Sequence, residues 1–251
     1  MIKPTLEIRL RMRERPQQRS PVLYEKWQDL LFIHWAYDPQ VIQRTLPKGL
    51  FVDTFEDKAY LGIVPFFMRD IHPRLFPPIP GLSDFQEVNV RTYVYDRNGI
   101  PGVWFYSLDA NQYVAVKTAR LFFNLPYYHA RMTAEFNPDS HEIVYSSCRY
   151  ETDPNLKSSF RYCPLTHTSL AQPGTLEFFL IERYILFAYS NNKLYSGRIW
   201  HYPYHLTDVA INYLDENLLY LDGFSKPSRT PDHKIMSHGV AVDIFGLEEV
   251  K

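Results

Sequence analysis

The sequence predicts a mainly β protein of the α+β class, in which an antiparallel sheet carries a few short helices. The 251-residue chain holds 19 tyrosines and 17 phenylalanines, and aromatic side chains pack well on a pleated sheet. Short segments of alternating or continuous apolar residues recur along it, several of them separated by turn residues. The 19 prolines against 10 glycines indicate many rigid loops and strand ends.

The hydrophobic content and the charge balance argue against a disordered chain, a nucleic-acid-binding protein and a membrane protein. Hydrophobic residues make up 45% of the chain, enough for a large core. The 27 lysines and arginines balance 28 aspartates and glutamates, so no net field attracts nucleic acid or an anionic membrane. No apolar run approaches a membrane span, and no secretion leader is recognisable. We expect a soluble cytoplasmic protein with neither nucleic acid nor membrane as partner. The composition is compatible both with a monomer and with a homo-oligomer.

Metal and cofactor binding lack local motifs. Cys148 and Cys163 are the only cysteines, which excludes a disulfide framework and a zinc site of four thiolates. His201 and His205 are four residues apart, but Pro203 opposes a helix there and no nearby carboxylate completes a ligand set. The GxSxG, HExxH, P-loop and GxGxxG patterns are missing. We expect no metal, no cofactor and two reduced thiols.

Residues 1–21 form an N-terminal arm that differs from the rest of the chain. In TLEIRLRMRER, apolar and charged residues alternate, which predicts a strand with one charged face. Five arginines lie between Arg9 and Arg19. They could bind an acidic partner, but charge runs are usually solvated, so we favour a solvent-exposed edge strand or loose arm. Residues 22–251 show no repeat and no low-complexity linker, and we treat them as a single domain.

The first half of that domain begins with the clearest helix, from Asp38 to Leu46. Asp38 is a suitable cap and Pro39 fits the first helical position. A buried strand is then expected in AYLGIVPFFM, followed by a proline-rich loop in HPRLFPPIPGLSD. The segment EVNVRTYVYDRNGIPGVWFYSLDA predicts a hairpin with its turn at Asn98–Gly99. A short helix is expected over 114–123, ending before Pro126.

The second half repeats the strand-rich pattern. Two strands are expected around the turn at 137–140, and residues 153–170 are expected to be irregular because they are polar. A short helix at Thr175 and a hairpin that turns at 191–193 follow, and DVAINYLD and HGVAVDIFG are further strand candidates.

One strand carries a row of chemically useful side chains. Alternation in EVNVRTYVY places Glu87, Asn89, Arg91 and Tyr93 on one face, with valines on the other. This polar face either meets solvent or lines the wet interior of a closed sheet whose apolar side meets the core. The residues by themselves leave both orientations open.

Several long motifs together resemble the YqjF-like DUF2071 family, over nearly the whole chain beyond residue 25. They are HWAYDPQVIQRTLPKGL, AYLGIVPF, FQEVNVRTYV, PGVWFYSLDA, ARLFFNLPYYHARM, ERYILFAYS and HGVAVDIF. This family is similar to a distant branch of the acetoacetate decarboxylase superfamily. The resemblance implies a curved antiparallel sheet that closes into a cone-shaped barrel around a pocket. It also implies that Glu87 matches a pocket glutamate, which favours the inward orientation of its strand.

The segment ARLFFNLPYYHARM departs from the decarboxylase pattern at its reactive positions. The resemblance aligns Arg120 and Pro126 with that pattern, but Tyr127 and Tyr128 stand where the decarboxylases carry two lysines, the first of which forms a Schiff base with the keto acid. A phenol cannot form an imine, so this mechanism is not expected here. A relocated amine would have to come from a residue such as Lys117, whose simpler interpretation is a solvated side chain.

The sequence thus predicts a pocket that binds a small organic acid or carbonyl compound. Its expected site residues are Glu87, Asn89, Arg91, Arg120, Tyr127 and Tyr128. An arginine would pair with a ligand carboxylate and the tyrosines would hold another oxygen. Chemistry that needs no imine, such as enolisation or hydration, is compatible with these groups, whereas catalytic residues are not assigned. The alternative is a non-enzymatic protein whose pocket is vestigial or sensory.

Overall fold

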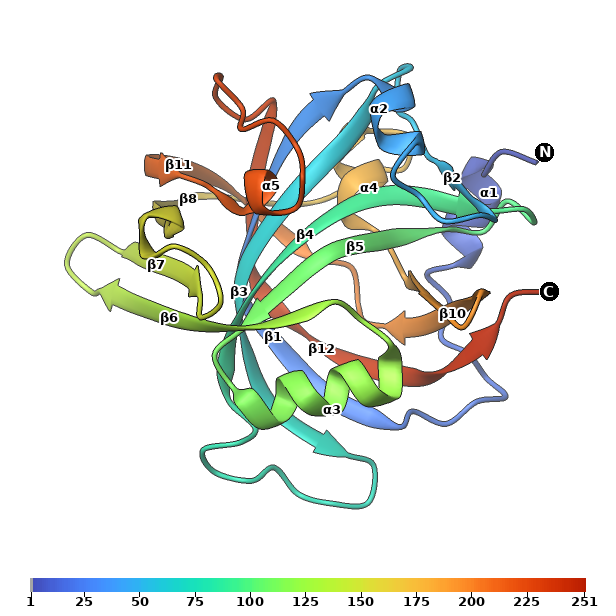
Figure 1. Ribbon diagram of the computed structural model, residues 1–251, viewed down its shortest axis with the longest axis horizontal. Helices are drawn as coiled ribbons and strands as arrows, with labels where there is room; N and C mark the ends of the chain where they lie inside the picture. The colour runs from blue at the N-terminus through green and yellow to red at the C-terminus, as the bar shows by residue number, and fades with distance from the viewer. Residues whose placement is uncertain (1) are drawn as a thin grey trace.

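The computed structural model describes residues 2–251 and contains one 12-stranded sheet with five α-helices (Figure 1). The strands are β1 (Leu23–Tyr37), β2 (Leu50–Val52), β3 (Ala59–Pro73), β4 (Phe85–Asp96), β5 (Pro101–Ala110), β6 (Tyr127–Asn137), β7 (Glu142–Arg149), β8 (Ser158–Leu170), β9 (Ile185–Ser190), β10 (Lys193–Trp200), β11 (His205–Asp215) and β12 (His233–Glu249). The helices are α1 (Leu6–Arg11), α2 (Pro39–Gln43), α3 (Tyr113–Phe123), α4 (Leu176–Ile181) and α5 (Leu218–Leu221). The mainly β prediction is therefore confirmed.

The sheet curves until distant strands pair. Its strand order is β10-β9-β5-β6-β7-β8-β11-β12-β1-β3-β4-β2, and β10 also pairs with β12 while β5 pairs with β4. These additional pairings close the path β12-β1-β3-β4-β5-β9-β10 into a ring of strands. The pairings of β5 with β6 and with β9 are parallel, so the sheet is not antiparallel throughout as the sequence suggested.

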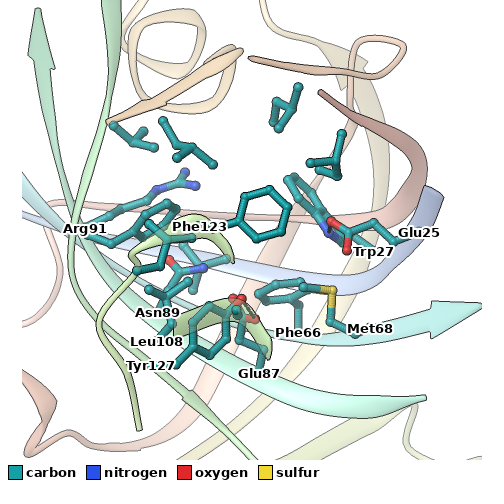
Figure 2. A pocket seen from close by; sticks show the side chains of 18 of the residues that line it. Glu25, Trp27, Phe66, Met68, Glu87, Asn89, Arg91, Leu108, Phe123 and Tyr127 are labelled. Atoms are coloured by element: carbon teal, nitrogen blue, oxygen red, sulfur yellow. Dashed lines mark hydrogen bonds between the residues drawn. The ribbon is translucent and has the colours of Figure 1, made fainter. Parts of the chain in front are cut away.

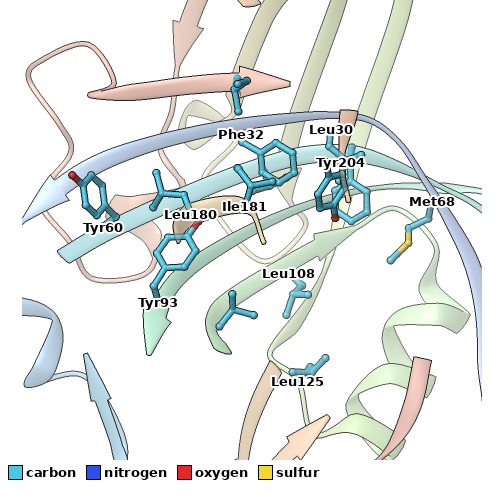
Figure 3. Packing of buried hydrophobic residues seen from close by; sticks show 14 of the residues in the cluster. Leu30, Phe32, Tyr60, Met68, Tyr93, Leu108, Leu125, Leu180, Ile181 and Tyr204 are labelled. Carbon is cyan, nitrogen blue, oxygen red and sulfur yellow. The ribbon is translucent and has the colours of Figure 1, made fainter. Parts of the chain in front are cut away.

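Strands β1, β3 and β4 form a wall that separates two hydrophobic clusters. Successive side chains on a strand point to opposite faces, and β4 follows this rule because Val88 and Val90 lie in one cluster while Tyr93 lies in the other. Met68 and Leu108 belong to the Tyr93 cluster (Figure 3), and both lie on the inner side of the ring of strands. The polar side chains that alternate with the β4 valines must therefore point into the ring.

Helix α3 lies across one end of this ring, away from α2, α4 and α5 (Figure 1). The Gln112 side chain caps it by accepting a hydrogen bond from the Val114 amide. The helix ends at Asn124, whose left-handed φ of 52° is one that asparagine tolerates well. This turn leads through Pro126 directly into β6, so a helix face and the first residues of a strand meet at the same end of the ring.

Two expectations for local structure are wrong. The arm forms helix α1 rather than a strand; Thr5 caps it, and Glu7 in its first turn with arginines in its last turn suit the helix dipole. Arg9 of this helix pairs with Asp53 at 2.8 Å, so the arm is attached to the domain. The segment expected to be irregular contains β8, where the buried Phe160 alternates with polar neighbours that the sequence analysis read as loop.

Among residues 2–251, no helix is both long enough and apolar enough to cross a membrane. The helix expected from Asp38 to Leu46 is present but shorter, as α2. The hairpin of β4 and β5, helix α3, and the β6–β7 and β9–β10 pairs lie where the sequence predicts them.

Candidate functional site

The ring of strands encloses a cavity of about 210 Å³. Side chains from β1, β3, β4, β5, β9, β10 and β12 line it, together with one face of α3, the end of α4 and the first residue of β6. Most of these side chains are aliphatic or aromatic. Polar groups are few, and three of them, Glu87, Asn89 and Arg91, come from the single strand β4 (Figure 2).

Glu87 and Tyr127 form a hydrogen-bonded pair inside the cavity. The Tyr127 hydroxyl donates to Glu87 Oε2 at 2.7 Å, and only 1% of Glu87 is exposed. Burial raises the pKa of Glu87 to about 8, against the lowering effect of the Tyr127 hydrogen bond. Burial and the adjacent Glu87 raise the pKa of Tyr127 well above its usual value. At neutral pH both groups therefore hold their protons, and the protonated carboxyl is a hydrogen-bond donor.

A second carboxyl group, Glu25 on β1, also lines the cavity, and sequence reasoning missed it. Trp27 Nε1 donates to Glu25 Oε1 at 2.7 Å, and burial raises the pKa of Glu25 to about 7. Repulsion between Glu25 and Glu87 contributes to the raised pKa of Glu87. Figure 2 shows Glu25 and Trp27 across the cavity from Arg91. The alternation of Leu23, Glu25 and Trp27, all of which face the cavity, was the only signal available in the sequence.

Arg91 brings a positive charge to the cavity without an anionic partner. Its guanidinium lies over the rings of Phe32 and Tyr93, at 5.4 and 5.6 Å from their centroids. Its hydrogen bonds are long, 3.3 Å to the Tyr93 hydroxyl and 3.4 Å to the Leu180 carbonyl. No aspartate or glutamate in the described part of the chain forms an ion pair with it. A buried cation in this state is costly, so the site favours an anionic ligand.

A second guanidinium at the cavity, that of Arg183, already has an ion-pair partner. Its Nη1 donates to Asp53 at 2.8 Å and its Nε donates to the Phe179 carbonyl at 2.6 Å. Burial lowers the pKa of Arg183 to about 10, so it still carries its charge at neutral pH. Because Asp53 also pairs with Arg9, two guanidiniums share one carboxylate, and this cluster holds the arm and α4 against the ring. Arg91 is the cavity-lining arginine that has no ion-pair partner among residues 2–251.

Asn89 lies between Glu87 and Arg91 on β4. Its side chain hydrogen-bonds toward Glu87 and thereby opposes the rise in the Glu87 pKa. Its Oδ1 is buried and has no hydrogen-bond partner among residues 2–251. Such an acceptor is rarely left unpaired in a folded protein, so it is available to a ligand hydroxyl or amine.

A hydrogen-bonded chain lies behind Arg91. The Tyr93 hydroxyl, which accepts from Arg91 Nε, is 2.6 Å from His34 Nε2, and His34 Nδ1 is 3.0 Å from Nδ1 of His233. Burial, with the nearby His233 and Arg91 charges, lowers the pKa of His34 well below its usual range. A Cβ atom at Gly62 would lie 2.8 Å from the His34 ring, so a glycine there leaves room for this chain.

Arg120 and Tyr128 do not line the cavity, so the structure does not bring these two expected site residues together with the other four. Arg120 is exposed on α3, and its Nε donates to the Tyr127 carbonyl at 2.6 Å. Strand alternation turns Tyr128 away from Tyr127, and its ring lies 4.2 Å below the guanidinium of Arg149. Lys117 is exposed as well, with its Nζ over the Tyr113 ring. Among residues 2–251, no lysine lines the cavity.

Metal binding has no support in this geometry. In the part of the chain that the structure describes, no group of three or more histidine, cysteine, aspartate or glutamate residues is arranged to hold a metal ion. His201 instead stacks on Tyr184, with ring centroids 4.7 Å apart, and its Nδ1 hydrogen-bonds the Tyr202 carbonyl. His205 belongs to β11 and is exposed.

Residues 24–241 match the model of DUF2071, described as an uncharacterized conserved protein. The chain belongs to the DUF2071 family. It is 34% identical over 227 residues to the uncharacterized protein YqjF of Bacillus subtilis (strain 168), which covers 88% of this chain and 92% of YqjF. The resemblance noted from the sequence motifs is therefore confirmed for this DUF2071 chain.

Solved structures share the fold at low sequence identity. The enduracididine biosynthesis enzyme MppR, complexed with pyruvate, superimposes with a TM-score of 0.67 at 12% identity, over 95% of this chain and 93% of MppR. Acetoacetate decarboxylase from Legionella pneumophila subsp. pneumophila str. Philadelphia 1 gives a TM-score of 0.62 at 15% identity, over 93% and 88% of the two chains. This DUF2071 chain therefore has the acetoacetate decarboxylase-like fold that its sequence implies.

Proposed function

We propose that the cavity binds a small organic acid or carbonyl compound, with Arg91 as the partner of a ligand carboxylate. The proposal rests on one observation: the guanidinium of Arg91 lines the cavity, has only long hydrogen bonds, and has no ion-pair partner among the described residues. A carboxylate there would replace weak contacts with charge-assisted hydrogen bonds. Asn89 and the Glu87–Tyr127 pair would then face the rest of the ligand. The pyruvate complex of MppR supports the proposal at the level of the fold.

Glu87 is the group best placed to move a proton. Its pKa of about 8 lies near neutral pH, where a carboxyl group can serve both as acid and as base. Protonated, it would donate a hydrogen bond to a ligand carbonyl oxygen; ionised, it would accept a proton from the carbon next to that carbonyl and give it back, which is enolisation. An imine route is not part of the proposal because no lysine of residues 2–251 lines the cavity.

Thermal-shift and calorimetric titration of wild-type protein with 2-oxo and 3-oxo acids tests the binding step. We expect a saturable complex that Arg91→Gln weakens by about 10- to 100-fold, since charged hydrogen bonds contribute about 1.5–3 kcal/mol. Arg161→Gln, at an exposed ion pair on β8, is the matched control and should bind like the wild type. Equal affinity in Arg91→Gln and wild type would refute the assignment of Arg91.

The chemical step is tested with a ligand that carries deuterium on the carbon next to its carbonyl group. NMR measures how fast this deuterium exchanges with solvent protons in the presence of the protein. We expect exchange in the wild type and none in Glu87→Gln, which still binds the ligand. Binding without exchange in the wild type would favour the alternative, a non-enzymatic binding or sensory protein.

The affinity for an anionic acid should fall as pH rises. Glu25 and Glu87, with pKa values of about 7 and about 8, are neutral at low pH and ionise as pH rises, after which they repel the ligand. Near the cavity, the charge of Asp109 raises the pKa of Glu87 and the hydrogen bond from Tyr127 lowers it. Titrations from about pH 6 to about pH 9 should give a Kd that rises toward the limit of about tenfold per pH unit. A Kd that is constant or decreases over this range would contradict the proposed carboxylate site.

A further inference from the structure

The cavity wall is mostly apolar, and its charged and amide side chains are the row on β4, Glu25 of β1 and Arg183. The strands that flank β4 place apolar residues beside the polar row: on β3, Phe66 is the register partner of Glu87, and on β5, Leu108 is the partner of Asn89. A ligand held along β4 would therefore meet polar groups mainly on that strand. Its remaining surface would lie against aliphatic and aromatic side chains (Figure 2).

We infer that the ligand is a carboxylic acid with an extended apolar body, rather than a short polar keto acid. This inference rests on the proposed carboxylate site at Arg91. A cavity of about 210 Å³ has room for about seven non-hydrogen atoms at the ~30 Å³ that a water molecule takes in the liquid. A carboxylate accounts for three of these atoms, so the apolar remainder is at least as large as the charged group.

Helix α3 sets the size of the apolar end. Ala115, Ala119 and Phe123 repeat every four residues and face the cavity from this helix. The alanines leave space that larger side chains would fill, and the Phe123 ring projects into the cavity in Figure 2. The length of acid that the site accepts should therefore depend on positions 119 and 123.

Straight-chain carboxylates from acetate to decanoate, all below their micelle concentrations, are suitable probes for calorimetric titration. Each methylene that enters an apolar cavity contributes about 0.8 kcal/mol, which is about fourfold in Kd. We expect the affinity to increase about fourfold per methylene, to level off near pentanoate or hexanoate, and to be weaker for hexanamide than for hexanoate.

Two variants test the cavity from opposite directions. Ala119→Leu should reduce the affinity for octanoate by at least tenfold and leave that for butyrate unchanged, whereas Phe123→Ala should extend the gain to longer acids. The melting temperature of each variant shows whether it is folded, and either variant alone suffices for the test.

The outcomes separate the inference from the proposed function. Acids that bind at Arg91 with the same Kd from butyrate to octanoate would overturn the apolar-body inference and leave the carboxylate site standing. Tighter binding of pyruvate than of hexanoate would have the same meaning. If no carboxylate binds at all, both the inference and the proposed function are wrong.

Discussion

The replacement Glu87→Gln should make the stability of the protein less dependent on pH between about 4.5 and about 8, because it removes a buried group whose ionisation opposes folding. Glutamine has nearly the same shape as glutamate and keeps an oxygen that can accept the hydrogen bond from the Tyr127 hydroxyl. The pKa of Glu87 is about 8 in the folded protein and close to its ordinary 4.5 in the unfolded chain. The folded state therefore retains a proton that the unfolded chain releases, and stability falls as pH rises from about 4.5 to about 8.

The size of the effect follows from the two pKa values. A shift of about 3.5 pKa units at about 1.36 kcal/mol per unit corresponds to about 5 kcal/mol, nearly all of it lost by pH ~8. Below pH ~4.5 the group is protonated in both states and contributes no such loss. Relative to wild type, Glu87→Gln should therefore gain about 4 kcal/mol in unfolding free energy between pH ~4.5 and pH ~8.

Urea denaturation across this pH range, read by tryptophan fluorescence and fitted at each pH, measures the difference. Glu25 titrates in both proteins and largely cancels. Glu135→Gln, an exposed position on β6, is the control and should follow the wild-type curve. If the wild-type and Glu87→Gln curves run parallel across the range, Glu87 does not carry a raised pKa, and the argument that it acts as proton donor at neutral pH fails with it.

Two further substitutions test the packing around the cavity. Gly62→Ala should destabilise the fold by about 1–3 kcal/mol, since its Cβ would lie 2.8 Å from the ring of His34, whereas Gly246→Ala, with its nearest contact at 3.9 Å, should be close to neutral. Arg149→Leu should cost about 3–5 kcal/mol because it leaves two buried aspartates unpaired, while Arg161→Leu removes an exposed pair and should cost less than about 1 kcal/mol. Chemical denaturation of each pair under identical conditions checks both statements, and equal effects within either pair would contradict them.

The sequence was most informative where a local rule decided the outcome. Alternation on β4 placed Glu87, Asn89 and Arg91 on one face, and the structure directs that face into the cavity. The direction itself could not be derived locally, because it depends on the pairings of β5 with β4 and of β10 with β12 that close the ring. Glu25 was missed for a related reason, since the pairings of β1 with β3 and of β3 with β4 bring a residue so distant in the chain to the same cavity as Glu87.

Arg120 was misplaced because spacing along the chain was taken as position in space. The cavity face of α3 repeats from Ala115 through Ala119 to Phe123. Arg120 follows Ala119 by one residue, which is a rotation of about 100° around the helix axis, and its side chain lies outside. Tyr128 differs from Tyr127 in the same way on a strand, where one residue reverses the direction of the side chain. The match of residue types and spacing to the decarboxylase pattern therefore identified the segment that reaches the cavity, but it did not identify which side chains of that segment enter it.

Tyr127, the one of the two adjacent tyrosines that enters the cavity, affects the charge of the site as well as its reactivity. A lysine at the position of Tyr127 would place an ammonium group next to Glu87 and favour the ionised carboxylate. The phenol instead stays neutral, and Glu87, buried beside it, is also neutral at pH values below about 8. Arg91 is then a cation at the cavity that has no ion-pair partner among the described residues. Such a cation in a mostly apolar cavity is the electrostatic complement of a carboxylate on an apolar body, so the charge of Arg91 and the character of the walls favour the same class of ligand.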